Sequence, residues 1–196
     1  MSTGQRVLLS REQISKRVIE LGQQIAADLD EEANRGGGTG EGAAAGAAGP
    51  IVLIPVLTGA LVFVADLIRA MPVAMSIKPV TLSSYPGKST TSQGVTVQSG
   101  VPMDLRGARV LIVDDILDSG KTLGLLRRLV EAQQPRSVRI AVLLNKRKPM
   151  GRAEEVRVEY SGFEIDDEFV VGYGLDFDGI YRNLPDIVTL SGPSAA

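Results

Sequence analysis

The chain has 196 residues, 44% of them hydrophobic, which is enough for a single domain with a sizeable core. It contains no cysteine and no histidine, which excludes disulfides, cysteine nucleophiles, Ser-His-Asp triads and zinc sites of cysteine or histidine; catalytic proton transfer would need Asp, Glu, Lys or Tyr. A formal net charge of −2 argues against a general nucleic-acid-binding protein.

The first residues carry mixed charge and no apolar run, so we expect no secretory signal. The absence of cysteine fits a cytoplasmic protein, which is the location we expect. One uncharged stretch, 42–65, is not a predicted membrane span, because its first part is rich in Gly and Ala and Pro55 and Gly59 interrupt the rest.

The first predicted element is an amphipathic helix over 10–29. Ser10 can cap it, and Gln13 completes a capping box. Its apolar residues recur every three or four positions: Ile14, Val18, Leu21, Ile25 and Leu29. The segment 36–50 that follows is low-complexity Gly/Ala and holds 7 of the 22 glycines, so we expect a flexible insertion.

Beyond the insertion, apolar runs of strand length alternate with helical patterns. The predicted strands cover 51–56, 80–84, 95–97, 109–113 and 138–144, and the predicted helices cover 60–70 and 121–133. This alternation predicts an α/β fold with a mostly parallel central sheet flanked by helices. The polar stretch 85–94 is predicted to be a mobile loop, and short strands and turns over 157–190 predict a second, smaller layer.

The most informative stretch is VLIVDDILDSGKT, over 110–122. A buried strand is predicted to end at two adjacent carboxylates, Asp114 and Asp115, and a short loop with a third, Asp118, precedes a helix. Ligands of open parallel sheets bind at the carboxyl ends of the strands, and backbone N–H groups at a helix start bind anions. The motif therefore predicts phosphate at 118–122, with the first two carboxylates facing hydroxyl groups or a metal.

Two other interpretations of this motif are weaker. Its last three residues match the end of a P-loop, but the first glycine of that motif would fall on Asp115, whose carboxylate would repel phosphate. A capped helix after a core strand is the purely structural interpretation, but three clustered carboxylates repel one another and are rarely kept without a partner. In the favoured interpretation the hydroxyls of Ser119 and Thr122 add to the phosphate pocket.

The sequence VDDILDSGKT at 113–122 resembles the loop that binds 5-phosphoribosyl-1-diphosphate (PRPP) in type I phosphoribosyltransferases. FVVGYGLD at 169–176, YRNLP at 181–185, LLNK at 143–146 and SSY at 83–85 resemble the hypoxanthine/guanine phosphoribosyltransferase family. The resemblance covers nearly the whole chain apart from the Gly/Ala insertion.

This resemblance implies the type I phosphoribosyltransferase fold in a single domain over 1–196. The core would span about 51–150, and a small hood would form from about 1–30 and 151–196. The implied reaction transfers the 5-phosphoribosyl group of PRPP to a 6-oxopurine, hypoxanthine and/or guanine, giving IMP or GMP and pyrophosphate, with Mg²⁺ as cofactor. It also implies a homo-oligomer, a dimer or a tetramer, and no nucleic-acid or membrane partner.

The resemblance implies a role for each matching residue. Asp118 would be the general base for a purine ring proton, and Asp114 and Asp115 would hold the ribose hydroxyls directly or through Mg²⁺, with Asp176 as a third metal ligand. The remaining PRPP and phosphate residues would be Asp118, Ser119, Gly120, Lys121, Thr122, Leu57, Thr58, Gly59 and Arg182.

Four residues would form the purine site. Lys146 would donate to O6, which favours 6-oxo over 6-amino purines because an amino group presents hydrogens to an ammonium. Phe169 would stack on the base, and backbone near Val170 and Asp176 would read its far edge. The loop that starts at Ser84 and Tyr85 would close and exclude water.

Three features depart from the family pattern: Thr58 stands where Lys or Arg is common, Asp114 stands where Glu is common, and the Gly/Ala insertion has no family role. Two rival functions stay open. One is a phosphoribosyltransferase for another base, such as xanthine or uracil; the other is an RNA-binding regulator on the same fold, which the chain's charge disfavours.

Overall fold

The computed structural model describes residues 5–36, 49–84, 95–97 and 100–190. Most of the Gly/Ala insertion and the predicted mobile loop 85–94, with Tyr85, lie outside these residues. Within them, no helix is long and apolar enough to cross a membrane.

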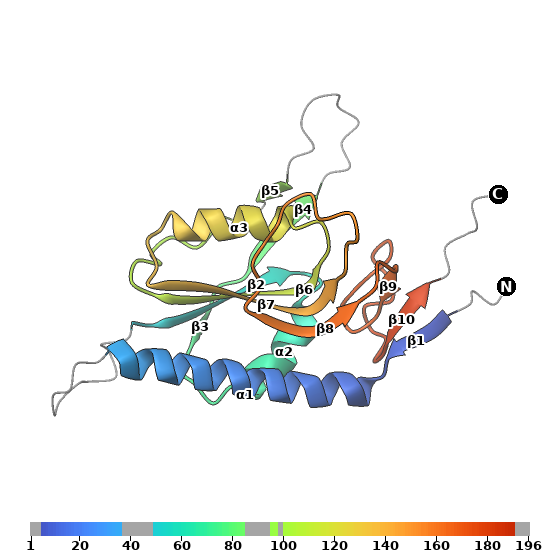
Figure 1. Cartoon of the computed structure of the whole chain (residues 1–196), viewed down its shortest axis with the longest axis horizontal. Coiled ribbons are helices and arrows are strands. Elements are labelled where there is room, and N and C mark those ends of the chain that lie inside the picture. Colours follow the sequence, from blue (N-terminus) through green and yellow to red (C-terminus); the bar gives the residue numbers. More distant parts are fainter. Residues whose placement is uncertain (1–4, 37–48, 85–94, 98–99, 191–196) are drawn as a thin grey trace, which may run out of the picture.

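A seven-stranded sheet forms the centre of the molecule (Figure 1), in the order β5-β4-β2-β6-β7-β8 with β3 paired to β2. Its strands are β2 (Ile51–Leu57), β3 (Ser76–Ile77), β4 (Val80–Ser84), β5 (Val95–Val97), β6 (Arg109–Leu117), β7 (Ser137–Lys146) and β8 (Tyr160–Ile165). Every pairing is parallel except that of β4 with β5, which confirms the mostly parallel sheet.

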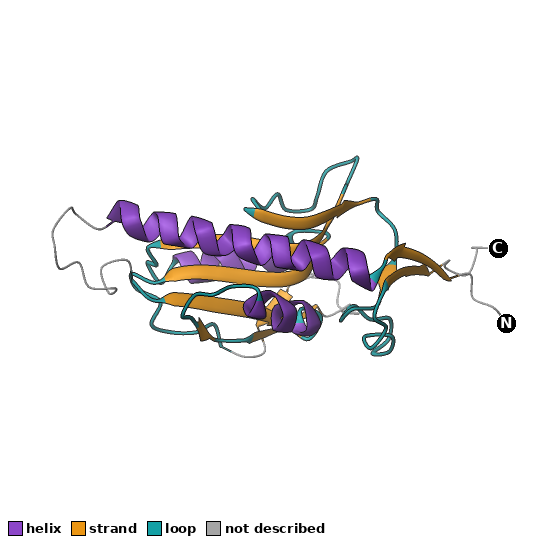
Figure 2. Ribbon diagram, turned by 90° about the horizontal axis from the view of Figure 1, so that it is seen from below, coloured by secondary structure: helices purple, strands orange, loops and turns teal. Residues whose placement is uncertain are grey.

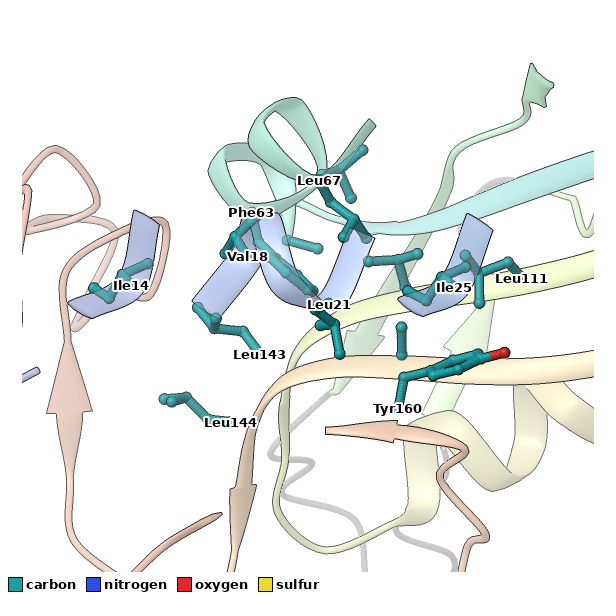
Figure 3. Close-up of a cluster of buried hydrophobic side chains, with 14 of the residues drawn as sticks. Ile14, Val18, Leu21, Ile25, Phe63, Leu67, Leu111, Leu143, Leu144 and Tyr160 are labelled. Carbon is teal, nitrogen blue, oxygen red and sulfur yellow. The ribbon is translucent and has the colours of Figure 1, made fainter. Parts of the chain in front are cut away.

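Helices cover both faces of this sheet. α1 (Arg11–Gly36) and α2 (Leu61–Arg69) lie on one face, and α3 (Lys121–Glu131) lies on the other (Figures 1 and 2). Alternate strand residues face opposite sides, so Leu111 of β6 packs toward α1 and α2, and its neighbour Ile112 packs toward α3. Figure 3 shows the cluster under α1, which includes Ile14, Val18, Leu21, Ile25, Phe63, Leu67 and Leu143.

The predicted boundary of α1 is wrong at its C-terminal end. The apolar stripe stops at Leu29, but the helix continues seven residues further, to Gly36. Polar contacts replace apolar packing over these last turns: Glu32 pairs with Arg139 at 2.9 Å, and Asp28 accepts a hydrogen bond of 2.9 Å from the Tyr160 hydroxyl. The capping box is confirmed, because the Ser10 N–H donates to Gln13 Oε1 at 2.8 Å.

A second, three-stranded antiparallel sheet, in the order β1-β10-β9, forms the hood together with the segment that joins β9 to β10. It pairs β1 (Gln5–Leu9), β10 (Ile187–Leu190) and β9 (Val170–Val171), so the two ends of the described chain meet there. The hood is smaller than the predicted segments: α1 packs on the central sheet, and β8 joins that sheet beside β7. Strand β1 was not predicted, because it is too short to show a clear alternation of apolar and polar residues.

Strand β6 is longer than predicted, and this matters for the site. It continues four residues past Val113, pairing with β7 as far as Leu117 and Asn145. Its other neighbour, β2, pairs with it only as far as Pro55 and Val113 and then runs beside β4. The end of β6 is therefore open on one side, which leaves room for a ligand where the two strands separate.

Candidate active site

A cavity of about 400 Å³ lies at the open end of β6. Ten of the predicted site residues line it: Leu57, Gly59, Asp114, Asp115, Asp118, Ser119, Gly120, Thr122, Asp176 and Arg182. They come from the end of β2, from β6, from the start of α3 and from the turn before β10, so only the tertiary fold brings them together. Thr58, Lys121, Lys146, Phe169 and Val170 do not line this cavity, and the Ser84 side chain lies outside the described residues.

Two adjacent carboxylates form the floor of the cavity, inside β6 rather than after it as predicted. Asp114 is only 6% exposed, and its Oδ1 accepts a hydrogen bond of 2.9 Å from the Asp115 N–H. Burial, together with the Asp115 charge, raises the pKa of Asp114 well above its usual value. Burial also raises the pKa of Asp115, although Arg182 opposes this. Two carboxylates held this way favour hydroxyl donors or a cation in front of them.

The start of α3 lies beside them, and a helix start is a position that can bind an anion. Gly120 precedes the helix with φ of +82°, and as a glycine it has no side chain to cap the first turn. The first N–H groups of α3 point out of the helix start, which lines the cavity. A Cβ on Gly120 would collide with the carbonyl oxygen of Glu154. The backbone N–H of Glu154 donates to Ser119 O at 3.0 Å. The segment around Glu154 thus holds the loop in place, and glycine is required for both its conformation and its close packing.

The turn after β2 forms the opposite wall. The Leu57–Thr58 peptide is cis, and Leu61 N–H donates to Thr58 O at 3.1 Å. Gly59 lies so close to the Asp115 carboxylate that a Cβ would collide with it, while its carbonyl packs against Gly174 of the hood. The turn is therefore fixed between a floor carboxylate and the hood.

Arg182 connects the hood to the cavity. Its Nη1 donates to Gly174 O at 2.7 Å, and its Nη2 pairs with Asp176 Oδ1 at 2.7 Å. The other oxygen of Asp176 accepts a hydrogen bond of 2.8 Å from the Gly179 N–H. Asp176, predicted as a metal ligand, thus has both oxygens engaged by the protein itself.

At the cavity rim, Asp118 belongs to a cluster of two carboxylates and two lysines. Lys146 Nζ lies 3.1 Å from Asp118 Oδ2 and 3.5 Å from Asp167 Oδ1. Lys148 Nζ lies 2.5 Å from Asp118 Oδ1 and 2.7 Å from Asp167 Oδ1. Burial alone would raise the pKa of Asp118, but the hydrogen bonds from the two lysines outweigh it and hold this pKa below its usual value.

Lys148 and Asp167 were not predicted as site residues. The run KRK at 146–148 suggested a solvated basic stretch around one useful lysine. The acidic run DDE at 166–168 is the complementary signal, but the pairing of β7 with β8 is needed to place the two runs side by side.

Phe169 comes directly before β9, two residues after Asp167, and is 49% exposed. Its ring meets Phe177 edge-on, with centroids 5.5 Å apart and an interplanar angle of 85°. Phe177, itself 53% exposed, was not predicted as a site residue. Val170 is buried and pairs with Thr189 in the hood sheet, so its backbone is held but its side chain faces the core.

Among the described residues, no group of three Asp, Glu, His or Cys side chains is arranged to hold a metal ion. The donor set that fits Mg²⁺ best is the adjacent carboxylate pair of Asp114 and Asp115, because Mg²⁺ is usually bound by one or two carboxylates with substrate oxygens and water.

The fold and the site together define a class of protein. Residues 13–178 match the family described as "Phosphoribosyl transferase domain", and the chain belongs to this family. The hypoxanthine-guanine phosphoribosyltransferase of Mycobacterium avium is 44% identical over 94% of this chain and 84% of its own. The hypoxanthine phosphoribosyltransferase of Escherichia coli is 38% identical over 92% of both chains.

A solved structure agrees with these relatives. A variant of the hypoxanthine phosphoribosyltransferase from Trypanosoma cruzi, complexed with the product IMP, superposes with a TM-score of 0.78. It is 34% identical and the match covers 95% of this chain and 90% of that one. The resemblance found in the sequence motifs is thus confirmed for the family and for the fold.

Proposed function

We propose that this protein is a purine salvage enzyme that transfers the 5-phosphoribosyl group of PRPP to hypoxanthine or guanine and releases pyrophosphate. The observation that carries this proposal is a cavity in which two adjacent carboxylates, Asp114 and Asp115, lie beside the uncapped start of α3. One end of the cavity suits a ribose with two hydroxyls and the other suits its 5-phosphate.

PRPP would be held from three sides. Ser119 and Thr122 add hydroxyl donors to the N–H groups of α3 around the 5-phosphate, with Lys121 in the same turn. The pyrophosphate would lie against the backbone of 57–59, where Thr58 offers a hydroxyl instead of a cation. Arg182 would then supply the positive charge, exchanging its contact with Asp176 for the anion.

Asp118 would accept the purine ring proton as the new bond to ribose forms. A general base has to be ionised and within reach, and the two lysines beside Asp118 keep it ionised. Lys146 is almost buried, with 9% of its side chain exposed, and its ammonium has three donors, so it can reach a purine O6 while staying near Asp118. Phe169 would stack on the base from the hood side.

We further propose Mg²⁺ as the cofactor, held by Asp114 and Asp115 together with PRPP oxygens. When bound, it would neutralise negative charge that builds up on the pyrophosphate leaving group. The charge of Asp115 repels that of Asp114, and a cation between the two carboxylates would relieve this repulsion. We also expect a homo-oligomer, a dimer or a tetramer, which light scattering on the purified protein would test.

The test is a steady-state assay with PRPP, Mg²⁺ and, separately, hypoxanthine, guanine, xanthine and adenine. We expect turnover of hypoxanthine or guanine, little with adenine, and loss of turnover when EDTA removes the metal. Absence of turnover with every 6-oxopurine would contradict the proposal.

A further inference from the structure

Lys148 lies beside the proposed general base but has no role in the proposed reaction. It follows β7 by two residues, its side chain is 20% exposed, and its ammonium lies between two carboxylates, Asp118 at 2.5 Å and Asp167 at 2.7 Å. A lysine in a solvated basic stretch would extend into water, whereas this one is directed into the cluster.

Arg147, the residue before Lys148, forms a much more exposed ion pair. Arg147 comes from the same stretch and also has an acidic partner, Asp166, at 3.2 Å, but 62% of the arginine and 73% of the aspartate side chain are exposed. Such an exposed pair contributes little. The backbone of the two loops is fixed independently, because the Arg147 N–H donates to Ile165 O at 2.8 Å. Lys148 therefore is not needed to hold the loops together.

Asp167 connects Lys148 to the hood. It lies on the segment between β8 and β9, two residues before Phe169, while Asp118 lies on the loop between β6 and α3. The Asp118 side chain is 47% exposed, so it needs partners to keep one orientation. Lys146 supplies one of them, but Lys146 is also the residue assigned to the purine O6.

We propose that Lys148 is a positioning residue for this reaction: it ties the Asp118 carboxylate to Asp167 and keeps the base oriented while Lys146 contacts the purine. This inference rests on the proposed function, in which Asp118 accepts the purine proton. Lys148 acts through Asp118 and touches neither substrate.

The experiment compares Lys148→Met, Lys148→Arg and the control Arg147→Met in the same assay. We expect Lys148→Met to lower kcat by about 10-fold, a part of the roughly 10²–10⁴-fold that a positioned acid–base group supplies. KM for PRPP should change by less than about 2-fold, because the PRPP contacts remain. Lys148→Arg should recover most of kcat, and Arg147→Met should match the wild type. A Lys148→Met enzyme that behaves like Arg147→Met would overturn the proposal.

A double variant tests whether Lys148 acts through Asp118. If it does, adding Lys148→Met to Asp118→Asn should leave the residual kcat unchanged, because the carboxylate that Lys148 orients is gone. An unchanged 10-fold loss in that background would mean direct contact with substrate, and would also overturn the proposal. If Lys148→Met fails to fold, Asp167→Asn removes the other end of the contact and should lower kcat several-fold by the same argument.

One readout does not depend on turnover. In carboxyl-labelled protein followed by ¹³C NMR, the titration midpoint of Asp118 should rise in Lys148→Met and stay unchanged in Arg147→Met. The charged groups recorded around Asp118 are Lys146, Lys148 and, beyond them, Asp167. If the wild type shows no turnover, the proposed function fails; if the midpoint does not move, the Lys148 contact fails.

Discussion

The ammonium of Lys146 lies 3.1 Å from the Oδ2 atom of Asp118, so the proposed purine-binding lysine and the proposed general base are in direct contact. Lys146 is at the end of β7 and Asp118 follows β6, its parallel neighbour. Adjacent parallel strands bring their carboxyl ends to the same edge, which is why the two residues meet.

Replacing Asp118 by Asn should remove the base and keep the loop. We expect kcat to fall by about 10²–10⁴-fold, with KM for PRPP within about 2-fold of the wild type, because the anion pocket at the start of α3 is unchanged. Steady-state kinetics with hypoxanthine measure both values. An unchanged kcat would reject Asp118 as the base.

Replacing Lys146 by Ala should weaken purine binding. The lost charge-assisted hydrogen bond to O6 should raise KM for the purine by about 10-fold or more, by the usual strength of such bonds. Binding of PRPP alone, measured by calorimetry with Mg²⁺, should stay close to normal. Arg147→Ala is the matched control and should alter neither. Equal losses in both affinities would argue that Lys146 supports the fold and not the purine site.

Replacing Gly59 by Ala should displace the Asp115 carboxylate, because the added Cβ has no room beside it. A misplacement of about 1 Å can cost about 100-fold in rate, so we expect a loss of this order in kcat/KM for PRPP. Gly100→Ala is the control, since no described residue lies within 4 Å of a Cβ built there. Wild-type kinetics in Gly59→Ala would show that the turn adapts.

Replacing Asp114 by Asn should stabilise the ligand-free protein. Burial raises the pKa of Asp114 above its value in the unfolded chain, so the native state holds the proton more tightly. The stability contributed by this group is therefore complete below the unfolded pKa and is lost as pH rises through the folded one. At pH 7 without Mg²⁺ or PRPP, Asp114→Asn should raise the free energy of unfolding, and each ~1 kcal/mol of increase should raise Tm by about 2–4 °C.

The control for this change is Asp30→Asn, at an exposed position of α1, which should shift stability by less than about 0.5 kcal/mol. Differential scanning calorimetry compares the variants, and PRPP binding should be weakened only in Asp114→Asn. A lower Tm for Asp114→Asn would show that the charged carboxylate is compensated within the fold.

The amino-acid sequence determined the local features of this protein. Short-range patterns are enough for these: the helical spacing of Ile14 to Leu29, the apolar strand at Ile51, and the run from Asp114 to Thr122 each depend only on neighbours along the chain. The absence of histidine also restricted the candidates for the general base to a few residue types, and the family resemblance predicts Asp118 for this role.

Only the tertiary structure decided the rest, because the remaining features depend on pairing between distant segments. The length of β6 beyond Val113 follows from the longer β7 beside it, and this puts Asp114 and Asp115 inside a strand. The hood is limited to three short strands because β8 finds its partner in the central sheet. Lys148 and Asp167 are 19 residues apart in the chain and meet only when β7 and β8 lie side by side.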